Sequence, residues 1–417
     1  MKRVAGCGLL VGMTMAIALA GCAREQVAQT MPSTTAARRL APIKPFAYAL
    51  GKPQPIRFPF AGETVTPYVA ADGEGGFLVS WVERHTATFN FAALRGGKWF
   101  QSRTIASGNL LVNKADFPSI AAGEHGLLFA QWIERNGHGS RIRLARSDDG
   151  GASWSTPVTP HPAIESEFGF ASLLPIGGGA VQAVWLDGRS LEGGEEGRGE
   201  MSLQSAVLTK DNTLTDDAAV DPRVCDCCQT GVALAAGGPL VVYRDRSADE
   251  IRDISVAQRS ARSWSAPATL HADAWKLLGC PVNGPRVAAD GRRVAVAWFT
   301  AAQDRPRVQL ALSNDGGVTF AAPVEIDEGH PIGHVDVALL ADGSAVATWV
   351  EESGSTARID ARRISAAAVA DPPLIVATGP SASALGYPRM AVSRDNVALV
   401  WNGESSVEVA AIPLTNR

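Results

Sequence analysis

The strongest constraint on the fold is an apolar run that ends in an aromatic residue and recurs seven times along the chain. The aromatic residues that end these runs are Trp81, Trp132, Trp185, Tyr243, Trp298, Trp349 and Trp401. They are separated by 51, 53, 58, 55, 51 and 52 residues. A repeat of roughly 50 residues, made of short β-rich runs joined by Gly and Asp turns, is typical of propeller blades. The sequence therefore predicts an all-β chain that folds as a β-propeller with seven four-stranded blades.

The two ends of the repeat region indicate how the ring closes. Each repeat reads as a strand of small residues, a turn, the aromatic-ended strand and two further strands. The seventh repeat is one strand short, whereas an unassigned run from Pro55 to Phe60 precedes the first repeat. We expect this N-terminal strand to complete the last blade and to leave no free edge. A six-bladed ring with one additional sandwich unit is the alternative.

The first residues have the features of a cleaved export signal. Lys2 and Arg3 precede an apolar run that is too short and too Gly-rich to span a membrane. Its end, Leu19-Ala20-Gly21-Cys22, resembles the lipobox of bacterial lipoproteins. The resemblance implies that Cys22 becomes the lipidated first residue and that Ala23 allows sorting to the outer membrane. An ordinary secretory signal with a chance cysteine is the alternative.

These features predict a division of the chain into a signal peptide (1–21), a flexible tether (22–45) and a single propeller (46–417). The 38 Lys and Arg residues and the 42 Asp and Glu residues are interspersed, so no basic stripe indicates nucleic-acid binding. No second apolar run indicates a membrane span. We therefore expect a monomer that contacts the bacterial outer membrane through its lipid only, on the periplasmic or the surface side.

Two hairpins carry a more specific motif. The runs Ser147 to Trp154 and Ser313 to Phe320 resemble the Asp box, S-x-D-x-G-x-[ST]-[WF], of sialidase-like and BNR-repeat proteins. In each motif the aspartate can accept backbone N–H groups of the turn, and the glycines supply positive φ. The resemblance implies a sialidase-like propeller, and the six-bladed alternative is the sialidase type. Because Asp boxes occur in enzymes and in scaffolds, they indicate the fold more than the activity.

Charged residues gather in the loops at one end of the predicted blades. By strand alternation, the loops after the aromatic strands and the loops before the small-residue strands share this face, opposite the Asp boxes. The resemblance to sialidases implies arginines that hold a substrate carboxylate, a tyrosine nucleophile with a carboxylate beside it, and an acid for proton transfer. The candidate substrate-binding residues are Arg189, Arg244, Arg246, Arg286 and Arg389. The candidate catalytic residues are Tyr387 as nucleophile, Glu167 or Glu250 as its partner, and Asp187 or Asp116 as proton carrier.

The sequence departs from the family at the first arginine. Thr66-Pro67-Tyr68 stands where the family has an R-I-P motif before the first inner strand. Another acidic or neutral glycan, or a ligand that is bound without cleavage, is therefore an alternative to sialic acid. The charged loops also have an ordinary interpretation as a solvated rim held by salt bridges.

Four cysteines remain after export, at Cys225, Cys227, Cys228 and Cys280. An even number of cysteines in an oxidising compartment favours disulfides, and Cys280 can pair with any of the other three. A copper or zinc site that adds His330 and His334 to these thiolates is the second interpretation, and free redox thiols are the third.

The leading functional hypothesis is an envelope lipoprotein that hydrolyses or binds glycans, sialic-acid-like acidic sugars among them, without a cofactor. If it is an enzyme, the resemblance implies an exo-α-sialidase-like retaining glycoside hydrolase. The alternative is a non-catalytic BNR-repeat protein that handles copper or zinc or serves as an assembly scaffold.

Overall fold

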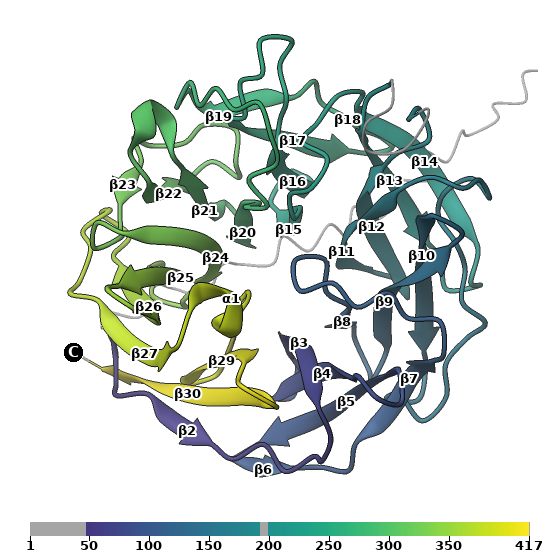
Figure 1. Cartoon of the computed structure of the whole chain (residues 1–417), viewed down its shortest axis with the longest axis horizontal. Coiled ribbons are helices and arrows are strands. Elements are labelled where there is room, and N and C mark those ends of the chain that lie inside the picture. Colours follow the sequence, from purple (N-terminus) through teal and green to yellow (C-terminus); the bar gives the residue numbers. More distant parts are fainter. Residues whose placement is uncertain (1–46, 192–198, 417) are drawn as a thin grey trace, which may run out of the picture. The chain divides into compact units, whose positions relative to one another are not determined.

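In the computed structural model, residues 47–191 and 199–416 are described, and they form a ring of antiparallel sheets (Figure 1). The described residues contain seven such sheets. This confirms the seven-bladed β-propeller. The export signal, the tether and Cys22 lie outside the described residues. No helix in the described part of the chain is both long enough and apolar enough to cross a membrane.

Each blade begins with its innermost strand, and the inner strands surround the centre of the ring (Figure 1). The inner strands are β3 (Thr64–Ala71), β8 (Ser119–Ala122), β11 (Phe168–Gly177), β15 (Gly231–Ala235), β20 (Arg286–Asp290), β24 (Pro331–Leu339) and β28 (Arg389–Ser393). The second strands are β4 (Phe77–Glu83), β9 (Leu128–Asn136), β12 (Ala180–Asp187), β16 (Gly238–Arg244), β21 (Arg293–Thr300), β25 (Ala345–Ser353) and β29 (Asn396–Asn402).

The outer half of each blade is more variable. The third strands are β5 (Thr88–Arg95), β10 (Gly139–Ser147), β13 (Ser202–Leu208), β17 (Ile254–Ser260), β22 (Arg307–Ser313), β26 (Thr356–Ile364) and β30 (Val407–Asn416). The outermost strands of six blades are β6 (Lys98–Trp99), β7 (Arg103–Ser107), β14 (Leu214–Asp221), β18 (Ser263–Trp264), β19 (Ala268–His271), β23 (Val324–Glu325), β27 (Leu374–Gly379), β1 (Tyr48–Leu50) and β2 (Gln54–Ile56). In the second blade, a bridge from Val158 to Leu144 takes the place of an outer strand.

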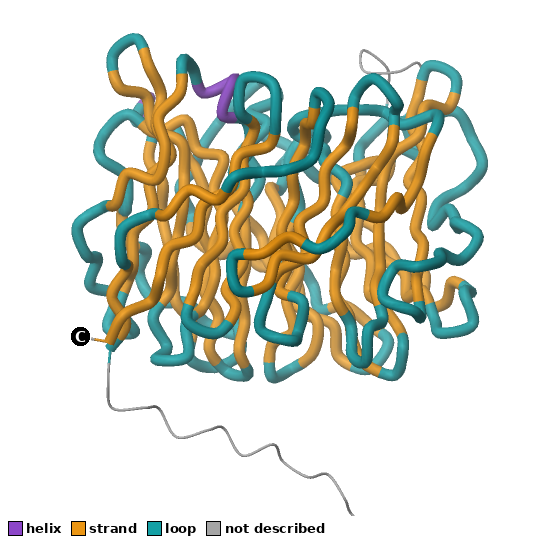
Figure 2. The backbone as a smooth tube through the Cα atoms, turned by 90° about the horizontal axis from the view of Figure 1, so that it is seen from below, coloured by secondary structure: helices purple, strands orange, loops and turns teal. Residues whose placement is uncertain are grey.

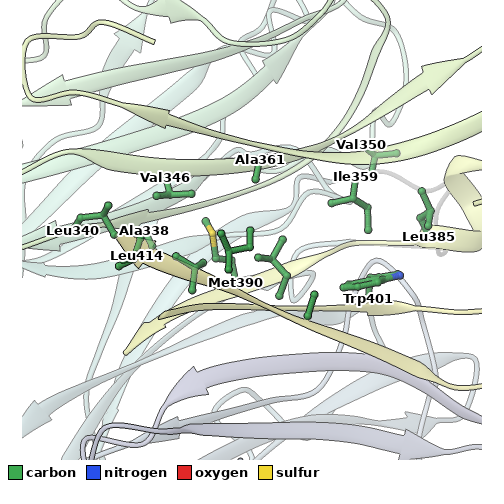
Figure 3. Close-up of a cluster of buried hydrophobic side chains, with 14 of the residues drawn as sticks. Ala338, Leu340, Val346, Val350, Ile359, Ala361, Leu385, Met390, Trp401 and Leu414 are labelled. Carbon is green, nitrogen blue, oxygen red and sulfur yellow. The ribbon is translucent and has the colours of Figure 1, made fainter. Parts of the chain in front are cut away.

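The second strands are buried on both faces because each blade packs between two neighbours. Trp185, Trp298 and Trp349 have no exposed surface, which explains why these strands read as continuous apolar runs. Figure 3 shows the core between the sixth and seventh blades, where Met390 and Trp401 lie beside side chains of the neighbouring sheet. Burial of a large apolar side chain contributes about 1.5–3 kcal/mol, so these layers hold adjacent blades together.

The N-terminal strands close the ring, as expected, although the closing strand has different bounds. β2 pairs with β30 from Gln54 to Ile56, and β1 pairs with the end of β30. The predicted strand from Pro55 to Phe60 was therefore too long at its C-terminal end. Phe58 and Phe60 instead pack against Trp81 and Trp99, with ring centroids 4.6–5.5 Å apart. Aromatic packing between the last and first blades replaces strand pairing there.

The Asp boxes form the predicted turns. The Asp149 carboxylate accepts hydrogen bonds from the backbone N–H and the hydroxyl of Ser153, at 2.9 and 2.6 Å, and Asp315 does the same with Thr319. These bonds lower the pKa of both aspartates. Gly151 has a φ of +83°, and a Cβ there would lie 2.3 Å from the ring of Phe91. Only glycine fits this turn.

The loops gather at two rims of the ring, and the one α-helix of the described residues lies at one rim (Figure 2). This helix, α1 (Ala382–Leu385), is capped by Ser381, whose hydroxyl accepts the N–H of Ala384 at 3.1 Å. Gly386 ends it with a φ of +67°, and Tyr387 follows. A short 3-10 helix, η2 (Ala302–Asp304), follows β21. The short α-helix therefore places Tyr387 where the chain enters the last blade.

Candidate functional site

A small recess lies among the inner strands of the first five blades. The residues that line it, called the central recess below, are Tyr68, Ala115, Asp116, Phe117, Ser119, Phe170, Ala171, Ser172, Leu173, Gln229, Thr230, Val232 and Arg286. Its volume is about 40 Å³. A water needs about 10–15 Å³ by this measure, whereas pockets that enclose whole small ligands reach about 300–1,000 Å³. The central recess can therefore hold a carboxylate or a hydroxyl group, but a whole sugar ring would have to lie outside it.

Asp116 is a buried acid in the wall of the central recess. Its Oδ2 atom accepts the backbone N–H of Phe170 at 2.8 Å, and a Cβ at Gly169 would lie 2.1 Å from the same oxygen. Burial raises the pKa of Asp116 to about 7, and the bond from Phe170 only partly offsets this rise. The carboxyl group can therefore exchange a proton near neutral pH, as a general acid requires.

Arg286 and Arg389 meet at one buried carboxylate, that of Asp336 in β24. The Arg286 Nε lies 3.2 Å from Asp336 Oδ1, and the Arg389 Nη1 lies 3.8 Å from Oδ2. Asp336 also accepts the backbone N–H groups of Val337 and Met390, at 2.9 and 2.8 Å. Coulombic attraction to Asp336 raises the pKa of Arg286 despite its burial. Asp336 thus connects the arginine of the central recess to the arginine of the last blade.

Arg389 is enclosed, with 1% of its surface exposed. Its guanidinium carbon lies 4.5 Å from the centroid of Phe117, a residue of the central recess, and 5.8 Å from that of Tyr387. Burial, together with the nearby charge of Arg286, lowers the pKa of Arg389 to about 10. The Arg389 guanidinium therefore remains positive at neutral pH, and it lies against the rings of Phe117 and Tyr387.

Tyr387 is held on both its ring and its hydroxyl. The ring stacks on His334 with centroids 3.8 Å apart, and the hydroxyl donates to the carbonyl of Val282 at 2.7 Å. The His334 Nδ1 lies 2.7 Å from the carbonyl of Gly386. Burial raises the pKa of Tyr387 to about 12 and lowers the pKa of His334 to about 4. At neutral pH the hydroxyl is protonated and the imidazole is neutral, so the nucleophilic role of Tyr387 stays a prediction.

Several acidic residues at the ends of the aromatic strands accept hydrogen bonds from tryptophan side chains, a role that sequence reasoning missed. The indole N–H of Trp185 donates to Asp187 at 2.8 Å, that of Trp132 donates to Glu134, and that of Trp349 donates to Glu351. Residues two positions apart in a strand point to the same side, which brings each carboxylate to the tryptophan before it. The pattern Trp-x-Asp/Glu was the available signal. It shows that these carboxylates satisfy buried indole groups.

Four other candidate residues, Asp187, Arg189, Arg246 and Glu250, lie in ion pairs. Arg189 makes two hydrogen bonds to Asp187, both 2.8 Å long. Arg246 pairs with Glu250 at 2.9 Å, and Glu250 also accepts from Arg252 at 2.8 Å. These contacts place Glu250 and Asp187 within salt bridges and not in the lining of the central recess. Their catalytic roles stay predictions.

Arg244 and Glu167 are placed by main-chain contacts. The Arg244 guanidinium donates four hydrogen bonds to the carbonyls of Arg252, Asn283 and Phe299, and it lies 4.8 Å from the centroid of Trp275. It therefore joins the loop between β16 and β17, the segment before β20 and the end of β21. Glu167 is half-buried, and its carbonyl accepts the N–H of Gly188 at 2.8 Å. The substrate and catalytic roles of these two residues also stay predictions.

The four cysteines in the described part of the chain form one disulfide and not two. Cys227 is bonded to Cys280, with Cα atoms 6.0 Å apart, and Cys225 and Cys228 are buried thiols. The Cys225 and Cys228 sulfur atoms lie 3.1 Å apart, beyond the bonded distance of about 2.0 Å. The predicted disulfide is therefore confirmed for Cys280, which pairs with Cys227, whereas Cys225 and Cys228 do not form a second bond. A hydrogen bond from Cys228 lowers the pKa of Cys225 to about 7, while burial raises that of Cys228.

The structure brings together only some of the residues predicted to bind a metal. Among the described residues, the potential ligand atoms of Cys225, Asp226, Cys227 and Cys280 lie within 4.8 Å of one another, and neither His330 nor His334 belongs to this group. His330 is exposed, and its backbone N–H donates to Glu351. Because a disulfide supplies no thiolates, Cys227 and Cys280 would have to be reduced before they could bind copper or zinc. A metal site stays a prediction.

Comparisons with known proteins support the fold. The comparison with protein-family models found no match, and neither did the comparison with curated proteins. Solved structures similar to the chain include a puromycin hydrolase S511A mutant complexed with PGG, with a TM-score of 0.52, 14% identity, and coverage of 85% of this chain and 53% of that one. The Hadza microbial sialidase Hz136 gives a TM-score of 0.41 and 15% identity over 69% of this chain and 63% of the sialidase.

A PL25 ulvan lyase, bound to its glucuronate and sulfated rhamnose oligosaccharide, gives a TM-score of 0.45 at 11% identity, over 82% of this chain and 79% of the lyase. This chain spans less than two thirds of the sialidase and about half of the puromycin hydrolase. At 14% identity the likeness to the puromycin hydrolase shows the fold alone. The seven antiparallel sheets of the described residues define the chain as a seven-bladed β-propeller.

Proposed function

We propose that this protein binds the acidic end of a glycan at the central recess and hydrolyses the terminal glycosidic bond. The observation that carries the proposal is that Asp116 and Arg286 line the same recess. A guanidinium group is suited to hold a carboxylate, and a carboxyl group with a pKa near 7 is suited to protonate a leaving oxygen. The volume of about 40 Å³ fits the carboxylate and leaves the sugar ring at the open face.

The proposal rests on Asp116 and Arg286 more than on the tyrosine. The hydroxyl of Tyr387 donates to Val282, and its raised pKa opposes nucleophilic attack. Retaining hydrolysis through Tyr387, with a sialic-acid-like sugar as substrate, is the finer form of the proposal. It requires the hydroxyl to leave the Val282 carbonyl when the substrate binds.

The first test measures hydrolysis of fluorogenic sialosides and uronosides by the wild type and by Asp116→Asn. We expect the variant to lose about 10²–10⁴-fold in kcat/KM, because a proton donor contributes about that much. Binding of the free acidic sugar, measured by calorimetry, should persist in Asp116→Asn and weaken in Arg286→Lys. Tyr387→Phe tests whether the tyrosine is the nucleophile. The variant should lose turnover if it is, and should retain turnover if it is not. A wild type that neither binds nor cleaves any acidic sugar would refute the proposal.

We also propose that the protein is anchored to the bacterial outer membrane through lipid on Cys22. The support is the lipobox-like sequence Leu19-Ala20-Gly21-Cys22. Cys22→Ser is expected to move the protein from the membrane fraction to the soluble fraction after cell lysis, with the loss of diacylglyceryl mass from the N-terminal peptide. Retention of the variant in the membrane fraction would contradict this anchor.

A further inference from the structure

Four sulfur atoms lie together in the loops before the fourth and fifth blades, and the proposed function uses none of them. This sulfur cluster consists of the Cys227–Cys280 disulfide and the thiols of Cys225 and Cys228. The Cys225 sulfur lies 3.1 Å from that of Cys228 and 3.9 Å from that of Cys227. One thiol therefore contacts both the second thiol and the disulfide. The segment Cys225 to Cys228 also has the C-x-x-C spacing that allows its two ends to form a disulfide.

The cluster has a buried end and an exposed end. Cys225 and Cys228 are 0% and 2% exposed, whereas Cys280 is exposed and Cys227 is partly exposed. A buried pair of thiols has no direct contact with solvent oxidants or reductants. Its oxidation state can nevertheless change through the neighbouring disulfide, because thiol–disulfide exchange needs only contact between the attacking sulfur and the bonded sulfur.

We propose that the sulfur cluster is a thiol–disulfide exchange site that passes two electrons between the buried Cys225 and Cys228 pair and the exposed Cys227–Cys280 pair. In the first step the Cys225 thiolate attacks the Cys227 sulfur. The Cys225–Cys227 bond forms, the Cys227–Cys280 bond breaks, and Cys280 leaves as a thiolate that takes up a proton. In the second step the Cys228 thiolate attacks the Cys225 sulfur. The Cys225–Cys228 bond forms, and Cys227 leaves and takes up a proton.

The two steps balance without any external oxidant. Two thiols, Cys225 and Cys228, are oxidised to a disulfide, and the Cys227–Cys280 disulfide is reduced to two thiols. A hydrogen bond from Cys228, and to a smaller extent the guanidinium groups of Arg244 and Arg252, lower the pKa of the attacking Cys225. Both are fixed in place: Arg244 by backbone carbonyls and Arg252 by Glu250. The arrangement around the attacking sulfur is therefore already formed in the resting state.

The exposed end defines the substrate class. A thiol-bearing molecule in solution can reach Cys280, and its thiolate would attack the Cys280 sulfur, form a mixed disulfide there and release Cys227. Small thiols and cysteine-containing peptides share this chemistry. The site would thus exchange electrons with external thiols through Cys280 and store them at the buried pair.

The test starts from purified full-length protein that carries one disulfide per chain, adjusted if necessary with limiting dithiothreitol and verified by intact mass. The sample is incubated anaerobically at pH 8 and quenched with acid. Free thiols are alkylated, bonded ones are reduced and labelled with a second reagent, and the four cysteines are assigned by peptide mass spectrometry. We expect two isomers, one with Cys227–Cys280 bonded and one with Cys225–Cys228 bonded. Detection of only Cys227–Cys280 in the wild type at all times would overturn the proposal.

Two variants separate the steps. Cys228→Ser is expected to stop the exchange after the first step, which leaves Cys225 bonded to Cys227 and Cys280 free. Cys225→Ser is expected to lose all exchange and keep only Cys227–Cys280. The same bonding pattern in both variants would contradict the relay. If either variant fails to fold, the ratio of the two disulfide isomers in the wild type still shows whether exchange takes place.

Reduced glutathione and a cysteine-containing peptide serve as probes of the exposed end. If both small thiols and peptide thiols are substrates, each probe should give a mixed disulfide on Cys280. If only one of these classes is a substrate, only the probe of that class should do so. A mixed disulfide found on Cys225 or Cys228, or none with either probe, would overturn the assignment of Cys280 as the point of contact.

Discussion

Replacing Asp336 with alanine is expected to lower the free energy of unfolding by about 3–5 kcal/mol, because removal of one partner leaves buried charges without compensation. Asp336 is 4% exposed and lies between Arg286 and Arg389, and it also accepts two backbone N–H groups. The variant leaves the Arg286 and Arg389 guanidinium groups without the carboxylate that they share. Urea unfolding followed by tryptophan fluorescence measures the change.

An exposed ion pair of the same chain provides the matched control. Arg305 and Glu325 pair at 2.7 Å with both side chains in solvent. Glu325→Gln should change the free energy of unfolding by less than about 1 kcal/mol, because exposed pairs contribute little. If Asp336→Ala lowers the free energy of unfolding as little as the control does, the two arginines must find other partners. Asp336 would then not be the link between the central recess and the last blade.

The second large effect is a dependence of stability on pH that originates at Asp116. Its pKa is about 7 in the folded protein, because burial disfavours the carboxylate, and about 4 in the unfolded chain. Between these values the folded state holds a proton that the unfolded state has lost. The stabilisation is complete below about pH 4 and is lost as the pH rises to 7. The two pKa values correspond to a loss on the order of 4 kcal/mol.

Asp116→Asn isolates this contribution because the amide has nearly the same shape and does not titrate. Other acids contribute equally to both proteins, so the difference between the two unfolding free energies is the quantity to follow from pH 4 to pH 8. We expect the wild type to lose stability relative to the variant across this window. Parallel curves would show that Asp116 ionises normally and would also remove the main support for its role as a proton donor.

The fold could be predicted because its signals are local and repeated. The seven aromatic-ended strands, the two Asp boxes and the missing strand of the last repeat each report a feature within a few residues of sequence. The register at the closure could not be read this way. Phe58 and Phe60 continue an apparent strand, and only their contacts with Trp81 and Trp99 show that they pack as aromatic plugs.

The candidate site was predicted only in part, because its contacts join distant segments. Asp116 and Arg286 were found as charged residues before or at inner strands, and they do line one recess. Asp336 was missed, since a single acid in an inner strand gives no sign that it will meet two arginines. The cysteine pairing was also beyond the sequence. All three partners for Cys280 lie within four residues, and only the positions of the sulfur atoms distinguish them.

The closure of the ring has a consequence for how the protein matures. Tyr48 pairs with Asn416, so the last blade contains strands from both ends of the propeller. Pairing across such a sequence separation is slow compared with local contacts. During synthesis, the first blade emerges long before the last blade can form, so Phe58 and Phe60 lack the part of their packing surface that the last blade supplies. The surface between the first and last blades therefore stays exposed, and prone to aggregation, until the last strands are made.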